Sequence, residues 1–124
     1  MKVRIVRTLV TALVVEILAI AMLVVAVALF GPSEADAAQE WAGETGRWLG
    51  PVAGFVFCVF GGWFVARGAD ADHVVHGLLL GAVVAAIDIG LLIAGGSEFE
   101  TVFVLSNLGR LIAGALGGWL AGRA

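Results

Sequence analysis

The sequence is poor in cysteine, histidine and charge, and each shortage excludes a class of protein. It has one cysteine, two histidines and 14% charged residues. Cys58 is alone inside an apolar run, so it cannot form an internal disulfide, and a buried thiol behaves as a small hydrophobe. The net charge is −3 and the basic residues are scattered, which does not favour nucleic acid binding. No nucleophile–base set, phosphate-binding loop or cofactor motif is present, so we expect neither catalysis nor a cofactor.

Long apolar runs make up most of the chain. Four of them are long enough to cross a bilayer as helices: residues 5–30, 48–66, 74–94 and 101–121. A hydrocarbon core about 30 Å thick requires about 20 helical residues at about 1.5 Å each. Hydrophobic residues form 61% of the chain, and the mean hydropathy is +1.07. The sequence therefore predicts an all-α membrane protein in which residues 1–124 form one domain of four transmembrane helices.

The distribution of basic residues predicts the orientation of these helices. One side of the membrane would hold Lys2, Arg4, Arg7, Arg67 and Arg123. The other side would hold Arg47 among six acidic residues, Glu34, Asp36, Glu40, Glu44, Glu98 and Glu100. Because cytoplasmic loops are enriched in Lys and Arg, we expect both termini in the cytoplasm.

The basic start of the chain also fits a secretory signal peptide. Ala35-Asp36-Ala37 would then supply the small residues of a cleavage site. The apolar run is about twice the usual length of roughly 7–15 residues, and Glu16 lies in its middle. We expect a retained first helix, with a cleaved signal as the alternative.

Two Gly-Pro pairs predict breaks in the helices on the outer side of the membrane. Gly31-Pro32 should end the first helix, and Gly50-Pro51 should turn the chain into the second, because proline disfavours helix in the residue before it. The segment 34–49 between them is predicted to be a short helix on the membrane surface, with Trp41 and Trp48 at headgroup level. An acidic loop is the alternative.

The second and fourth runs end in the same pattern, which indicates an internal repeat. Gly61-Gly62-Trp63 is followed by Arg67, and Gly117-Gly118-Trp119 is followed by Arg123. Both runs would cross from outside to inside, so the chain is predicted to form two helical hairpins in a parallel repeat. Each arginine is expected at the membrane interface, with the tryptophan one turn deeper on the same face: Trp63 with Arg67, and Trp119 with Arg123.

Glycines recur at spacings that favour close helix packing. Gly46, Gly50 and Gly54 form two overlapping GxxxG patterns, and we expect this face to join copies of the chain, most simply in a dimer. Further packing glycines are expected in the later helices: Gly61, Gly62, Gly77, Gly81, Gly114, Gly117 and Gly118.

Three charged residues fall at membrane depth: Glu16, Asp88 and Arg110. A charge at the bilayer centre is costly, so such residues face protein or water and usually pair. Asp88 and Arg110 share helix faces with the small residues of their runs, which should meet in the bundle centre. We expect a Glu16–Arg110–Asp88 cluster. It is either a structural ion pair that sets helix register or a site for an ion, a proton or a substrate.

His73 and His76 lie three residues apart at the start of the third run, beside Asp70 and Asp72. This spacing places both imidazoles on one helix face, where they could bind a metal. Solvated residues at a helix start are the commoner explanation, and no metal site is predicted.

The stretch GGWFVARGADADHVVHGLLLG, together with GGWLAGR, resembles small four-helix bacterial membrane proteins of uncharacterised activity. These share a GGxxAGR helix end and an HGxxxG helix start, covering residues 61–81 and 117–123 here. The resemblance implies a bacterial inner-membrane location and a four-helix fold. A comparison with small multidrug resistance transporters extends only to four short helices and a carboxylate in the first, Glu16.

Two functions follow from these features. The first is a non-catalytic module that associates with itself or with other membrane proteins, with the lipid bilayer as its environment. The alternative is a transporter or channel for a small solute or ion, including a proton-coupled transporter, that uses Glu16, Asp88 and Arg110.

Overall fold

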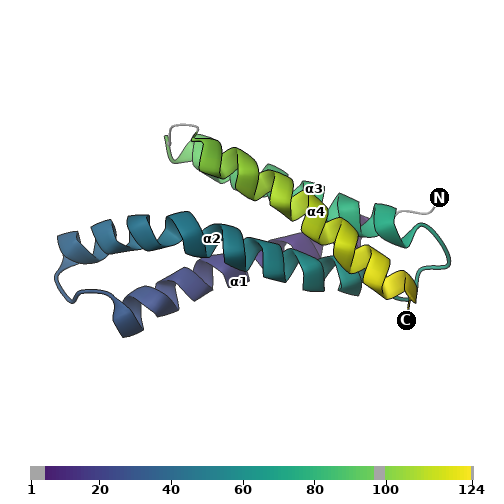
Figure 1. Ribbon diagram of the computed structural model, residues 1–124, viewed down its shortest axis with the longest axis horizontal. Coiled ribbons are helices and arrows are strands. Elements are labelled where there is room, and N and C mark those ends of the chain that lie inside the picture. Colours follow the sequence, from purple (N-terminus) through teal and green to yellow (C-terminus); the bar gives the residue numbers. More distant parts are fainter. Residues whose placement is uncertain (1–4, 97–99, 124) are drawn as a thin grey trace.

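The computed structural model describes residues 5–96 and 100–123, which form four helices and no strand (Figure 1). The helices are α1 (Ile5–Phe30), α2 (Ala35–Ala66), α3 (His73–Ala94) and α4 (Thr101–Arg123). Each is long and apolar enough to cross a membrane, which confirms the prediction of an all-helical fold with four candidate membrane-spanning helices. Lys2, Arg4 and Glu98, which entered the charge argument, lie outside the described residues.

Successive helices run in opposite directions along the bundle (Figure 1). Ile5 at the start of α1 and Arg123 at the end of α4 therefore lie at the same end, called the proximal end below; the other is the distal end. α4 packs against α2 and α3, and α1 packs against the same two helices. Among the described helices, α1 and α4 do not contact each other. The α2–α3 pair is the centre of the molecule.

α2 is longer than the sequence predicts. It begins at Ala35 rather than at residue 48, and it continues through Pro51 without a break. The expected turn at Gly50-Pro51 is therefore wrong, and residues 35–49 form neither a separate surface helix nor a loop. With 32 residues, α2 is about 48 Å long, which exceeds a hydrocarbon core of about 30 Å.

Contacts with other segments hold the part of α2 on the distal side of Pro51. Gly46 lies against the side chain of Leu23 in α1. Arg47 Nη2 forms an exposed ion pair with Glu100 Oε2, 3.1 Å away. Membrane helices tolerate proline where neighbouring segments pack against them, and α1 packs against this part of α2.

Glycines bring the backbones of α2, α3 and α4 together. A Cβ at Gly62 would overlap the carbonyl of Gly114, and a Cβ at Gly77 would overlap that same carbonyl and the backbone of Gly118. Close approach of this kind is how small residues stabilise pairs of transmembrane helices. The predicted packing glycines that lie against a neighbouring backbone are Gly62, Gly77, Gly81, Gly114, Gly117 and Gly118.

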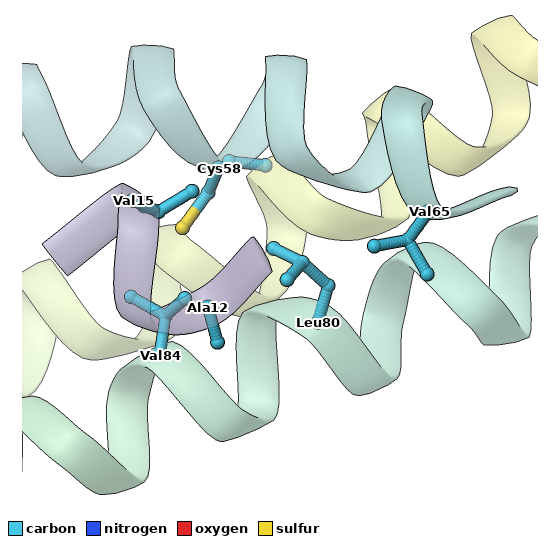
Figure 2. Close-up of a cluster of buried hydrophobic side chains, with 7 residues drawn as sticks. Ala12, Val15, Cys58, Val65, Leu80 and Val84 are labelled. Atoms are coloured by element: carbon cyan, nitrogen blue, oxygen red, sulfur yellow. The ribbon is translucent and has the colours of Figure 1, made fainter. Parts of the chain in front are cut away.

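α1 joins this unit through side chains instead. Between Ile5 and Phe30 it has no glycine, and its buried residues form one narrow stripe: Thr8, Ala12, Val15 and Glu16. Figure 2 shows Val15 beside Cys58 of α2, with Leu80 and Val84 of α3 approaching from the other side. Gly61 also faces α1, because a Cβ there would lie 2.9 Å from the Val15 side chain.

Two grooves remain between α1 and α2. The first, about 420 Å³, lies beside the buried stripe and is lined by residues such as Val14 and Phe60. The second, about 600 Å³, lies between the distal halves and is lined by residues such as Phe30, Trp41 and Trp48. α1 also has the fewest buried residues of the described helices, four against six or seven in each of the others, so it is the most loosely packed.

Candidate functional site

Asp88 and Arg110 form an ion pair inside the bundle. Arg110 Nη1 lies 3.0 Å from Asp88 Oδ2. Arg110 is 4% exposed, and the Asp88 side chain is 20% exposed. Gly81 explains the contact, since it lies directly against the backbone of Arg110 and brings α3 close to α4 one to two turns from Asp88. The glycine contact between the helices thus places the two opposite charges together.

Asn107 is a member of this site that the sequence interpretation missed. Its side-chain oxygen accepts a hydrogen bond from Arg110 Nη1 at 3.3 Å. Its amide nitrogen donates to the carbonyl of Phe103, one turn earlier in α4, at 2.9 Å. Asn107 precedes Arg110 by three residues, so both side chains share a helix face. This spacing is visible in the sequence and could have identified Asn107 as a neighbour of Arg110.

Gly54 provides the space for the guanidinium group. A Cβ at this position would lie 2.6 Å from Arg110 Nε and 2.8 Å from Nη2. Gly54 was predicted to face a partner chain as part of the GxxxG pattern. In the structure it lies against Arg110 within its own chain, so any side chain there would displace the buried arginine.

Glu16 lies at the same region of the bundle but is not paired in the way Asp88 is. It is 6% exposed, and its Oε2 has no hydrogen-bond partner among the described residues. It is within electrostatic range of Arg110 and Asp88. Arg110 Nε is likewise buried without a hydrogen-bond partner. The three residues predicted as a cluster are therefore grouped, while direct contact joins only Asp88 and Arg110.

Cys58 of α2 lies in the same region as these charges. It is fully buried and is within electrostatic range of both Arg110 and Glu16. In Figure 2 its sulfur points toward the α1 residues Ala12 and Val15.

The Trp–Arg pairs of the repeat form cation–π contacts at the proximal end. The guanidinium carbon of Arg67 lies 4.6 Å from the Trp63 ring centre, and that of Arg123 lies 4.8 Å from the Trp119 ring centre. Arg7 makes a comparable contact, 4.3 Å from the Phe64 ring. Its Nη2 also donates to the Phe64 carbonyl at 2.7 Å, which links α1 to the end of α2.

The two histidines occupy different environments. His76 is 3% exposed, and its Nδ1 lies 2.7 Å from the carbonyl oxygen of Asp72. The His73 ring lies near Gly122, because a Cβ there would be 3.2 Å from His73 Nδ1. Within residues 5–96 and 100–123, no group of three His, Cys, Asp or Glu side chains is arranged to hold a metal ion.

No protein-family model, curated protein or solved structure matches the chain, so the comparisons assign neither a family nor a fold.

Proposed function

We propose that the chain is a non-catalytic module of the bacterial inner membrane that associates with other membrane-spanning chains, either further copies or different proteins. The supporting observation is an open groove of about 360 Å³ between the middle of α2 and the distal half of α4. It is lined by Pro51, Val52, Phe55, Val56, Val102, Leu105, Ser106 and Gly109.

Small residues make this groove suitable for another helix. Ser106 and Gly109 lie along its α4 side. A Cβ at Gly109 would meet only the Phe55 side chain, 3.8 Å away, whereas Gly46 and Gly54 of the GxxxG pattern face neighbours in the same chain and Gly50 does not line the groove. Close approach at small residues favours association of transmembrane helices, so Gly109 is the glycine of this groove that is left for a partner.

The association is tested by placing a bulky side chain at Gly109. A Cβ there meets only the Phe55 side chain, so Gly109→Leu should lower the oligomeric fraction in mild detergent without disturbing the packing of its own chain. Gly90→Leu is the matched control, because Gly90 of α3 is also open and does not line the groove. The fraction is measured by light scattering after size-exclusion chromatography. A monomeric wild type, or an equal effect of the two substitutions, contradicts association through this groove.

The proposal includes an orientation with both termini in the cytoplasm. Arg7, Arg67 and Arg123 belong to helix ends at the proximal end of the bundle, and Arg47 lies toward the distal end. In a Cys58→Ala background, single cysteines at Ser33 and Asp70 are exposed to an impermeant thiol reagent in intact cells. We expect labelling at Ser33 and none at Asp70; the reverse pattern overturns the orientation.

The two-hairpin repeat is part of the same proposal. It is supported by α2 and α4 running in the same direction and ending in matching Trp–Arg contacts. The glycine pairs that precede these contacts also pack α2 against α4, with Gly62 against Gly114 and Gly117 against Val59.

A second candidate function is transport of an ion or small solute, and the buried Glu16 carboxyl favours it. The Arg110 guanidinium is paired with the Asp88 carboxylate, which leaves Glu16 as a second acidic side chain at membrane depth without an ion-pair partner. If this function holds, Glu16→Gln folds normally in proteoliposomes and abolishes a proton- or ion-dependent flux. A flux retained by the folded variant contradicts a transport role for Glu16.

A further inference from the structure

Among the described residues, few charged and titratable groups lie near Glu16. Of the described helices, α1 packs against α2 and α3. The groups within electrostatic range of Glu16 are Arg110 of α4 and Asp88 of α3, and Cys58 of α2 is in turn within range of Glu16. On α1 itself, Arg7 is nine residues away and is bound to Phe64 at the proximal end.

The positive charge of Arg110 is already balanced by the Asp88 carboxylate. Its Nη1 is 3.0 Å from Asp88 and 3.3 Å from Asn107, and its Nε and Nη2 face Gly54. Arginine stays protonated in proteins, so the Asp88–Arg110 pair is neutral as a whole. If Glu16 were also ionised, one negative charge would remain in the core without a counter-charge.

The surroundings of Glu16 do not stabilise a carboxylate. Its Oε2 is buried and accepts no hydrogen bond from the described residues. Its neighbours on the α1 stripe, Ala12 and Val15, belong to the apolar core cluster. A buried acid whose nearby arginine is already paired with another carboxylate, and whose buried oxygen accepts no hydrogen bond, is neutralised rather than left charged.

We propose that Glu16 is a proton-binding site at membrane depth, where the carboxyl group holds one proton while Asp88 stays ionised against Arg110. The proton on Glu16 is what allows α1 to pack on α2 and α3. This deepens the transport candidate by naming the proton as its ligand. It concerns the resting state of the folded protein, so it can hold when no flux is found.

Charge matching makes the proposal specific. With one arginine, one of the two carboxyl groups is ionised and the other is protonated. Asp88→Asn removes the carboxylate that pairs with Arg110, and Glu16 then ionises as the replacement counter-charge. Glu16→Gln removes the protonated group itself. Both substitutions keep the size of the side chain, so they isolate the change in charge.

Infrared spectroscopy of the whole protein in lipid nanodiscs at pH 7 tests this directly, because a protonated carboxyl gives a carbonyl band separate from those of carboxylates and amides. We expect a band in the wild type that shifts in heavy water and is lost in both Glu16→Gln and Asp88→Asn. A wild type without such a band, or a band that remains in Glu16→Gln, overturns the assignment.

Cys58 provides a second readout within the native chain. It is the one cysteine and is fully buried beside α1. Loss of the Glu16 proton at high pH should loosen α1 and speed alkylation of Cys58 by a membrane-permeant maleimide. Thiolate formation raises the rate in every variant, so the wild type is compared with Glu16→Gln. We expect their rate ratio to rise several-fold with pH; a constant ratio contradicts the link between the proton and α1 packing.

Discussion

The interface that joins α2, α3 and α4 differs in kind from the interface that attaches α1. In the first, glycines such as Gly77 and Gly114 place backbone directly against backbone. In the second, side chains from one stripe of four buried residues on α1 pack on α2 and α3, and α1 contributes no glycine. The buried charges divide in the same way, since Asp88 and Arg110 are paired across the glycine interface and Glu16 is on α1.

This difference indicates where the molecule can change. Backbone contacts at glycine leave no room for an intermediate arrangement, so α2–α4 should behave as one rigid unit. The α1 interface lacks such contacts and contains an acidic residue whose charge depends on a proton. α1 is therefore the helix that can move at low cost.

The largest expected effect comes from breaking the ion pair within the rigid unit. Arg110→Leu leaves Asp88 buried without a partner, which costs about 3–5 kcal/mol in soluble proteins. The unfolding free energy is measured by titration with SDS in mixed micelles. A second change, Asp88→Asn, should restore more of the loss than Glu16→Gln does, because Asp88 is the residue in contact.

If Glu16→Gln restores more stability to Arg110→Leu than Asp88→Asn does, the Asp88–Arg110 ion pair is contradicted. If neither second change restores stability beyond the sum of the single effects, Arg110 has no carboxylate partner in the membrane.

A smaller loss is expected from overfilling the glycine interface. Gly114 lies against the carbonyl of Gly77 and the backbone of Gly81. Gly114→Leu should therefore lower the unfolding free energy by about 1–3 kcal/mol, the usual cost of added volume in a packed core. Gly90→Leu in an open position is the control. Equal thermal stability of the two variants in nanodiscs would show that the glycine contacts are not tight.

The smallest effect is expected from adding volume beside α1. Val14 lines the groove of about 420 Å³ between α1 and α2. Val14→Phe has room to enter that groove, so the unfolding free energy should change by less than about 0.5 kcal/mol, as for a surface substitution. A loss as large as that of Gly114→Leu would mean that the two interfaces are equally tight.

The fold was predictable from the apolar runs to the level of four candidate membrane-crossing helices, and the end of the first helix at Phe30 is confirmed. The start of α2 was not predictable, because a Gly-Pro pair signals a break by local rules alone. The contacts of Gly46 with Leu23 and of Arg47 with Glu100 lie in other segments, and local rules do not include them.

The site was predictable only as a set of residues. Helical phase identified the faces on which Asp88 and Arg110 lie, but it does not give the rotation and depth of one helix against another. It therefore left open which carboxylate pairs with Arg110. The GxxxG pattern had the same limit, since the spacing of Gly54 indicates close packing without saying whether the neighbour is a second chain or, as here, the Arg110 side chain.

Distances between spin labels test the central claim, that α1 is held less tightly than α4. In a Cys58→Ala background, nitroxides are placed at the exposed residues Ile17 of α1, Leu91 of α3 and Ile112 of α4. Pulsed electron paramagnetic resonance in nanodiscs then compares the pair Ile17–Leu91 with the pair Ile112–Leu91, which share one label. We predict a broader distance distribution for the pair that includes α1, and further broadening of that pair alone at high pH. Distributions of equal width at every pH would contradict the distinction between a rigid α2–α4 unit and a loosely held α1.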